Sequence, residues 1–357
     1  MQNEINSPEL DPPFQPVRNK LYSSMELLNG FDPRDPESMA RTLDFQSYLY
    51  FVRNGRATPR HPYAGMMQVM HDGSVARAMY EFIATHGRPA AAIMGGHKEI
   101  RGSETYAQVA SLAATLTDRG FLVASGGGPG AMEATHLGAL MAGRSGGELA
   151  EAVELLARTP KLPNTANVVD KDGNVSIELV KQLHEWAAPA IELQASIKSG
   201  GVSLAVPSWH YGHEPLSPLA THVAKYFLNS IREDVLLALA TNGIVFAKGR
   251  AGTLQEVFQD AAQNYYASGD QPFAPMVFLD RKFWQQEMPV EPLLKALFEN
   301  NGKKDEYALN VRFTDSVEEA ATFLQERRPS SQMVATRMEK LGLGPMLQSL
   351  SVGWPTA

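Results

Sequence analysis

A glycine-rich turn followed by a carboxylate is the segment of the sequence best suited to chemistry. The turn follows the apolar run at residues 244–247 and consists of Gly249, Arg250, Ala251, Gly252 and Thr253. Such a turn between a strand and a helix directs several backbone N–H groups at one point, which binds phosphate without a metal. Glu256 follows three residues later, so its carboxylate would lie beside the phosphate. The segment predicts chemistry on a nucleotide or a sugar phosphate.

Glu256 also has a purely structural explanation. Residues 253–256 read T-x-x-E, the capping box in which Thr253 accepts from the N–H of Glu256 and the Glu256 carboxylate accepts from the N–H of Thr253. A glutamate in a first turn also suits the helix dipole. The spacing alone favours this cap over catalysis, because a carboxylate occupied by backbone N–H groups is a poorer base.

Two more glycine-rich turns end apolar runs that we predict to be buried strands. Residues 90–95 end in Gly95 and are followed by Gly96, and residues 121–125 are followed by Gly126, Gly127, Gly128, Pro129 and Gly130. In doubly wound sheets, ligands bind outside the carboxyl ends of the strands. The three turns can therefore form one crevice.

The spacing Gly126-x-Gly128-x-x-Ala131 also fits the dinucleotide fingerprint, but its context does not. The fingerprint follows the first strand and needs an acidic residue at the end of the next strand. Here the loop follows the second predicted strand, and residues 148–157, where the acid should stand, are predicted to be helical. A nicotinamide or flavin enzyme is therefore disfavoured, and we expect no organic cofactor.

Three basic residues are candidates for contact with an anion. Arg232 lies on or beside the apolar stripe of a predicted helix, with Leu228 and Leu236 four residues before and after it. Arginine is rarely buried unpaired, so Arg232 needs either a core carboxylate or a bound anion, and both remain open. Lys98 and Arg101 follow the first glycine pair, where they either meet a phosphate or are exposed loop charges.

The segment after the third predicted strand is rich in polar and aromatic residues. His210, His213 and Glu214 lie within five residues of one another, but a metal site needs more ligands at fixed spacing. We expect no metal, and these residues are expected to line the crevice. Trp209 or Tyr211 would either stack on a base or be buried in the core.

Composition narrows the class of protein. The chain has 357 residues, and 32 lysines and arginines against 39 acidic residues give a net charge of −7, which argues against a nucleic acid polymer as partner. The absence of cysteine excludes disulfides, thiolate metal sites and thiol nucleophiles. The N-terminal residues lack the pattern of a signal peptide, and no apolar run is long enough to span a membrane. We expect a cytoplasmic protein.

Strands alternating with helices predict an α/β fold with a doubly wound parallel sheet. The predicted strands are residues 90–95, 121–125, 202–206, 244–247, 275–279 and 311–314. Helices are expected at 103–119 (capped by Ser103), 131–141, 218–241 and 316–326. Residues 1–87 form an N-terminal extension, with an extended surface segment over 1–20 and helical tracts at 38–52 and 73–85. The domain at 88–328 carries a helical insertion at about 145–198, broken by a loop at 160–174, and 329–357 form a tail with one weak helix near 331–341.

Three motifs in this order resemble the LOG (Lonely Guy) family, whose members were formerly described as lysine decarboxylases. Residues 126–134 read GGGPGAMEA, Arg232 follows, and residues 248–256 are similar to the family pattern P-G-G-x-G-T-x-x-E. The resemblance covers about residues 88–325. It implies a Rossmann-like fold, a homodimer or higher homo-oligomer, and phosphoribohydrolase activity. Such enzymes cleave nucleoside 5′-monophosphates such as AMP to the base and ribose 5-phosphate.

The resemblance also assigns roles to residues. The family's arginine and glutamate correspond to Arg232 and Glu256, which we expect to be catalytic. The expected substrate contacts are Gly95, Gly96, Gly126, Gly127, Gly128, Gly130, Met132, Glu133, Gly249, Arg250, Ala251, Gly252 and Thr253. Lys248 and Arg250 replace the family's proline and second glycine. These departures and the helical insertion leave a non-catalytic nucleotide-binding or sensor protein as the alternative.

Overall fold

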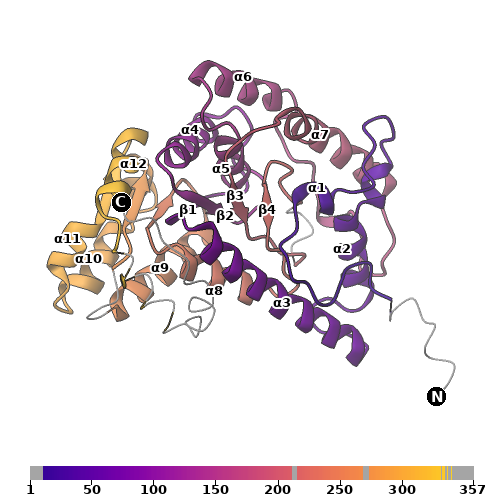
Figure 1. Ribbon diagram of the computed structural model, residues 1–357, viewed down its shortest axis with the longest axis horizontal. Helices are drawn as coiled ribbons and strands as arrows, with labels where there is room; N and C mark the ends of the chain where they lie inside the picture. Colours follow the sequence, from indigo (N-terminus) through magenta and orange to yellow (C-terminus); the bar gives the residue numbers. More distant parts are fainter. Residues whose placement is uncertain are drawn as a thin grey trace.

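A seven-stranded parallel sheet forms the centre of the protein (Figure 1). The computed structural model describes residues 11–210, 215–267 and 273–330, together with 332, 333, 336 and 339. Across the sheet, the strands are β4 (His222–Val223), β3 (Ser203–Ala205), β2 (Leu122–Ser125), β1 (Ala90–Met94), β5 (Ile244–Phe246), β6 (Met276–Leu279) and β7 (Val311–Thr314). Every neighbouring pair is parallel. The predicted α/β, Rossmann-like fold is confirmed.

The sequence of β1 explains why it lies at the centre. All five of its residues are buried, as expected for a strand covered on both faces. Ala92 pairs with Ala124 of β2 on one side and with Ile244 of β5 on the other. Because side chains alternate between the faces of a strand, Ile93 packs in one hydrophobic cluster and Met94 in another.

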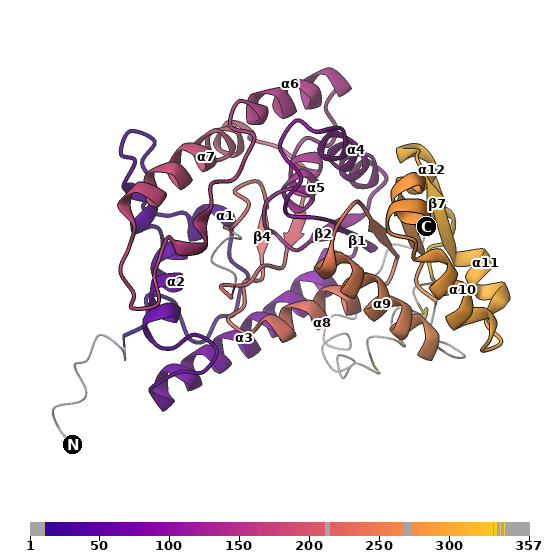
Figure 2. The same cartoon turned by 180° about the vertical axis from the view of Figure 1, so that it is seen from behind.

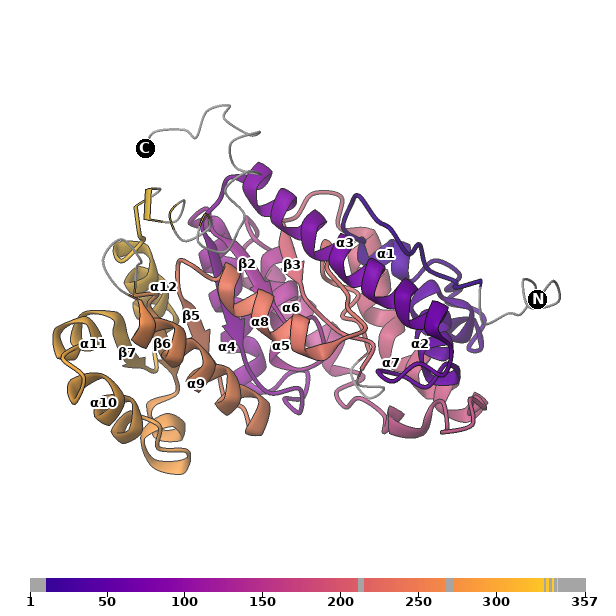
Figure 3. The same cartoon turned by 90° about the horizontal axis from the view of Figure 1, so that it is seen from below.

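Helices cover both faces of the sheet. One face carries α4 (Glu104–Asp118), α5 (Ala131–Leu140) and α12 (Val317–Glu326), and the other carries α3 (Pro62–His86), α8 (Asn229–Leu239) and α9 (Ala251–Tyr266). Figure 3 shows α3 beside α8 across the second face. The predicted cap of α4 is confirmed, since Ser103 Oγ accepts from the Tyr106 amide at 3.2 Å. Seen from behind, α10 (Glu291–Glu299) and α11 (Lys304–Asn310) lie near β7 at one end (Figure 2).

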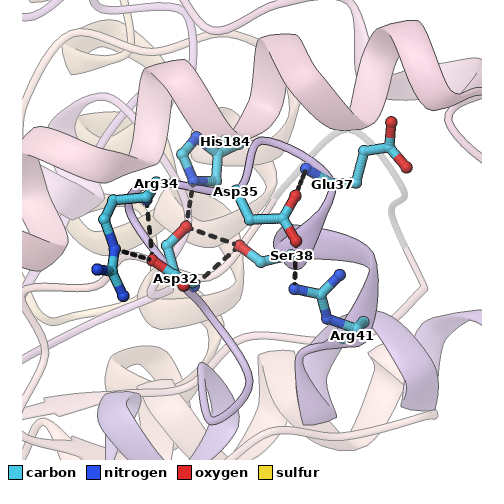
Figure 4. A network of polar contacts seen from close by, with 7 residues as sticks. All are labelled: Asp32, Arg34, Asp35, Glu37, Ser38, Arg41 and His184. Atoms are coloured by element: carbon cyan, nitrogen blue, oxygen red, sulfur yellow. Dashed lines mark hydrogen bonds and ion pairs between the residues drawn. The ribbon is translucent and has the colours of Figure 1, made fainter.

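The predicted helical insertion is present. It contains α6 (Gly146–Ala157) and α7 (Ile177–Ser196), separated by a loop with a 3₁₀ turn, η3 (Thr165–Asn167). On the inner side of α7, His184 Nε2 lies 2.9 Å from the backbone oxygen of Asp32, which also accepts from Ser38 Oγ at 3.0 Å (Figure 4). The His184 ring stacks on Phe31 at 4.6 Å. These contacts attach the insertion to the N-terminal extension.

The N-terminal extension packs into the same core as the sheet. Its described helices are α1 (Ser24–Leu27), the 3₁₀ turn η2 (Ser38–Arg41), α2 (Leu43–Arg53) and α3. Tyr22 forms an antiparallel bridge with Val223 of β4 and covers that edge of the sheet. The expected surface position of residues 1–20 is wrong for Phe14, which is 3% exposed and packs 4.6 Å from Phe227; residues 1–10 lie outside the described part.

Two predicted helices have other limits in the structure. The tract expected at 73–85 begins eleven residues earlier, at Pro62, because proline suits the first position of a helix. The helix expected over 218–241 begins only at Asn229, and its first part contains β4. Here Thr221 Oγ1 accepts from the Ser203 amide at 2.9 Å and donates to the Ser203 carbonyl at 2.8 Å, so pairing with β3 outweighs local helical preference.

The ends of the chain add little to the described structure. Most of the tail at 329–357, including most of the weak helix expected near 331–341, lies outside the described residues. In the portion that is described, we found no helix with the length and apolar character needed to cross a membrane.

Candidate active site

A cavity lies where the order of the strands reverses. From β1 the chain builds β2, β3 and β4 on one side, and it then returns to add β5 on the other side. A cavity of about 560 Å³ opens at the carboxyl ends of β1 and β5. Ligands of open α/β sheets bind at such a switch point, and the volume suits a small molecule.

Two of the three predicted turns meet at this cavity. The Gly96 amide donates to the Lys248 carbonyl at 2.8 Å, which joins the loop after β1 to the turn after β5. The lining residues are Gly95, Gly96, His97, Lys98, Glu99, Met132, Arg232, Glu233, Lys248, Gly249, Arg250, Ala251, Gly252, Thr253, Glu256, Phe283 and Glu287. The structure therefore brings together both expected catalytic residues and the whole of the 249–253 turn.

The capping box expected at Thr253 is wrong. Helix α9 begins at Ala251, two residues earlier, so Thr253 lies inside its first turn. A Cβ atom at Gly249 would lie 2.1 Å from Thr253 Oγ1, so only glycine allows this close contact. The first amides of a helix have no partner within the helix. The N-terminus of α9 consequently presents backbone donors at the cavity wall, as the sequence predicted.

Arg232 is held at the wall of the cavity by several contacts. Its Nε donates to the Val206 carbonyl at 3.0 Å, just beyond β3. Its Nη1 lies 3.9 Å from a carboxylate oxygen of Glu256 and 3.9 Å from one of Glu233. A Cβ atom at Gly126 would lie 2.3 Å from Nη2. Arg232 thus has a fixed position among carboxylates while it still borders the cavity, and its contact with a bound anion stays a prediction.

Glu233 is a site residue that the sequence did not reveal. Its carboxylate accepts from Asn229 Nδ2 at 2.7 Å and from Gln255 Nε2 at 2.9 Å, so it links α8 to α9. Glu256 projects from the second turn of α9, and its side chain is 15% exposed, against 20% for Glu233. The only signal for Glu233 was its place next to Arg232, which is not a motif.

The basic residues of the cavity differ in their availability. Lys248 Nζ lies 2.7 Å from a carboxylate oxygen of Asp280, and this bond raises the pKa of Lys248. Lys98 and Arg250 are exposed, and neither side chain has a hydrogen bond or an ion pair within the described residues. Lys98 and Arg250 are therefore the cations best placed to receive an anion.

The third glycine turn packs against the loop after β1. Gly126, Gly127, Gly128 and Gly130 do not line the cavity. Gly130 has a φ of +71°, and a Cβ atom there would lie 2.5 Å from the Gly96 carbonyl oxygen. Met132, at the start of α5, does reach the cavity. The turn allows the loops after β1 and β2 to approach closely, and its contact with a substrate stays a prediction.

Glu133 and Arg101 form a buried ion pair. Arg101 donates to both Glu133 carboxylate oxygens at 2.7 Å, and Tyr106 Oη donates to one of them at 3.1 Å. Arg101 also donates to the Trp186 carbonyl of α7 at 2.7 Å. The expectation of an exposed loop charge at Arg101 is wrong, because its partner on α5 was not apparent from the sequence. Glu133 is fully buried and does not line the cavity.

The loop after β3 gives no support for a base-stacking tryptophan. Trp209 is 2% exposed, stacks on Phe227 at 4.5 Å, and donates to Asp44 at 2.8 Å. His210, which was expected to line the crevice, is not among the residues that line the cavity. Residues 211–214, including Tyr211, His213 and Glu214, lie outside the described residues. Among residues with a described position, no group of three or more histidine or acidic side chains could hold a metal ion.

Comparisons with known proteins add no assignment, since no protein-family model matches the chain and no curated protein is significantly similar to it. The resemblance to the LOG family consequently stays an expectation from three motifs. What can be inferred about function rests on the geometry of the cavity.

Proposed function

We propose that the protein hydrolyses the N-glycosidic bond of nucleoside 5′-monophosphates, with release of the base and ribose 5-phosphate. The observation that carries this proposal is the position of Glu256. Its carboxylate lies 3.9 Å from Arg232 Nη1 in a cavity that also contains the N-terminus of α9. A carboxylate beside a phosphate-binding turn is the arrangement that cleavage of a nucleotide at its ribose needs.

The phosphate end of the cavity is formed by the 249–253 turn. The free amides and the dipole at the start of α9 favour an anion there. Arg250 belongs to this turn and Lys98 follows the neighbouring glycine pair, so both can add a charge-assisted hydrogen bond. The phosphate is remote from the bond that breaks, and its binding would fix the ribose relative to Glu256.

Glu256 would act at the anomeric carbon. Cleavage of an N-glycosidic bond passes through a sugar with oxocarbenium character, which a nearby carboxylate stabilises. The oxygen of a water molecule forms a bond to that carbon, the bond to the base nitrogen breaks with its electron pair, and Glu256 accepts a proton from the water. The leaving nitrogen takes a proton from solvent. Arg232 would hold Glu256 in position or contact the substrate.

The test is release of ribose 5-phosphate from AMP, GMP, CMP and UMP by the purified protein. Glu256→Gln should reduce turnover at least about 100-fold while nucleotide binding changes little. Glu233→Gln is a matched control, because Glu233 lies at the same distance from Arg232 Nη1 but is held by Asn229 and Gln255. Its turnover should fall less than about tenfold. Nucleotide binding without release from any of the four would instead show a non-catalytic nucleotide-binding protein.

A further inference from the structure

The helix that carries Arg232 begins without a cap of its own. The N-cap of α8 is Leu228, and its side chain makes no hydrogen bond to the first turn of the helix. Asp72 of α3 lies at this point instead. Its Oδ1 accepts from the Phe227 amide and its Oδ2 from the Leu228 amide, both at 2.9 Å. A carboxylate at this end of a helix is also favoured by the helix dipole.

Asp72 is fully buried, which makes its bonds to these amides important. Its other neighbour is His71, whose Nδ1 lies 3.2 Å away and whose Nε2 lies 2.9 Å from Tyr22 Oη. Burial lowers the pKa of His71, although Asp72 acts in the opposite direction. A buried carboxylate is costly unless hydrogen bonds satisfy it. The two amides therefore fix Asp72 and the start of α8 to each other.

The start of α8 is one helical turn away from Arg232. The Arg232 amide donates to the Leu228 carbonyl at 3.5 Å, within the first turn. The side chain then reaches back to the Val206 carbonyl at 3.0 Å. A shift of Leu228 would move the backbone of Arg232 while its guanidinium is held at Val206. The distance from Arg232 to Glu256 depends on where Asp72 holds the helix.

We infer that Asp72 is a positioning residue for Arg232, through which the N-terminal extension shapes the active site. Figure 3 shows the geometry that makes this possible, with α3 lying along α8. The catalytic consequence rests on the proposed hydrolase function. The structural consequence does not depend on that function: when the carboxylate is removed, the first turn of α8 should be displaced or frayed.

The experiment compares Asp72→Asn with Tyr22→Phe in the full-length protein. The asparagine side chain replaces one of the two acceptors with an NH₂ group that faces a backbone N–H. Tyr22→Phe removes the hydroxyl bonded to His71 in the same buried cluster and leaves both bonds of Asp72 intact. Hydrogen exchange of the segment 227–236 should rise about tenfold in Asp72→Asn and stay unchanged in Tyr22→Phe, as expected for loss of a helix cap.

Turnover of the nucleotides that the wild type cleaves gives a second readout. In Asp72→Asn, kcat should fall about tenfold with KM within about twofold, because a misplaced Arg232 affects the transition state. Leu228→Pro removes the amide that donates to Oδ2, and it should reproduce a smaller part of both effects. This variant decides the question if Asp72→Asn fails to fold.

Two outcomes would overturn the inference. One is equal exchange and equal kcat in Asp72→Asn and Tyr22→Phe, and the other is an unchanged first turn of α8 in Leu228→Pro. If the wild type releases no ribose 5-phosphate, the hydrolase proposal is wrong, and the exchange data alone still decide whether Asp72 holds α8. If the wild type is active and exchange is unchanged, only the positioning role is wrong.

Discussion

Lys248 Nζ lies 2.7 Å from a carboxylate oxygen of Asp280, which joins the turn after β5 to the residue after β6. Asp280 has a φ of +83°, an unusual value for a residue with a side chain. Its other oxygen accepts from the Phe283 amide at 2.8 Å, at the start of the π-helical turn η4 (Phe283–Glu287). Because Phe283 and Glu287 also line the cavity, the pair links the turn after β5 to a second part of the cavity lining.

A double-mutant cycle with Lys248→Met and Asp280→Asn should reveal coupling between these residues. Partial burial raises the pKa of Asp280, but the bonds from Lys248 and the Phe283 amide outweigh this effect and lower it. Both side chains are partly exposed, so we expect a coupling of only about 0.5–1 kcal/mol in the free energy of unfolding. Urea denaturation measures it, and strictly additive effects would show that the pair does not link the two parts of the cavity lining. KM for a nucleotide should rise more than kcat falls.

Arg250→Gly and Lys98→Ala should each weaken nucleotide binding through loss of phosphate contacts. A charge-assisted hydrogen bond contributes about 1.5–3 kcal/mol, so Kd should rise about tenfold or more. Calorimetry with AMP and with adenosine separates the contributions, since adenosine has no phosphate and its affinity should not change. Lys295→Ala is a suitable control, because Lys295 lies on α10 and pairs with Glu291 outside the cavity. Equal losses for AMP and adenosine would place the phosphate elsewhere.

The stability of the protein should fall as the pH drops below about 6.5, in part because of His136. Burial lowers the pKa of His136 from 6.5 to about 3, and its Nδ1 lies 3.0 Å from Ser203 Oγ. Between these values the unfolded chain binds a proton that the folded protein does not, so the free energy of unfolding rises with pH by up to about 1.4 kcal/mol per unit.

His136→Gln removes this titration and should flatten the dependence of stability on pH below 6.5. Urea denaturation at several pH values between about 4 and 7 measures the slope. Some slope should persist, because burial also lowers the pKa of His71 and contributes with the same sign. If the dependence of stability on pH is the same in His136→Gln, then His136 is protonated in the folded state or does not cause the loss of stability at low pH.

Arg101→Met should destabilise the protein by about 3–5 kcal/mol, because it leaves Glu133 buried without its cation. The double substitution Arg101→Met with Glu133→Met should recover part of this loss, since no charge then remains in the core. Chemical denaturation of the three proteins provides the measurement. The double variant would instead be less stable than Arg101→Met if the two substitutions acted independently. In that case, loss of the ion pair is not the reason that Arg101→Met destabilises the protein.

Local patterns in the sequence were sufficient for most of the fold. Six of the seven strands follow from apolar runs, and the cap at Ser103 follows from a side chain that bonds its own helix. The two residues of β4 could not be predicted, because their pairing depends on β3 and on Tyr22, which lie far away in the chain.

The site was predictable to the same extent. The turn at 249–253, Arg232 and Glu256 were found because their order and spacing form a motif. The burial of Arg101 was missed because its partner Glu133 belongs to another element, 32 residues away. Glu233 was missed because its contacts with Asn229 and Gln255 exist only when α8 packs on α9. Contacts between elements leave little trace in one sequence.

The bond between Asp72 and the Leu228 amide joins residues 156 positions apart. Closing such a long loop is slow compared with forming a local helix, because the chain loses entropy before the contact stabilises it. During synthesis, α3 is made long before α8, so Asp72 at first lacks the two amides of Phe227 and Leu228. The start of α8, and Arg232 with it, can therefore make this contact only when most of the chain has been made.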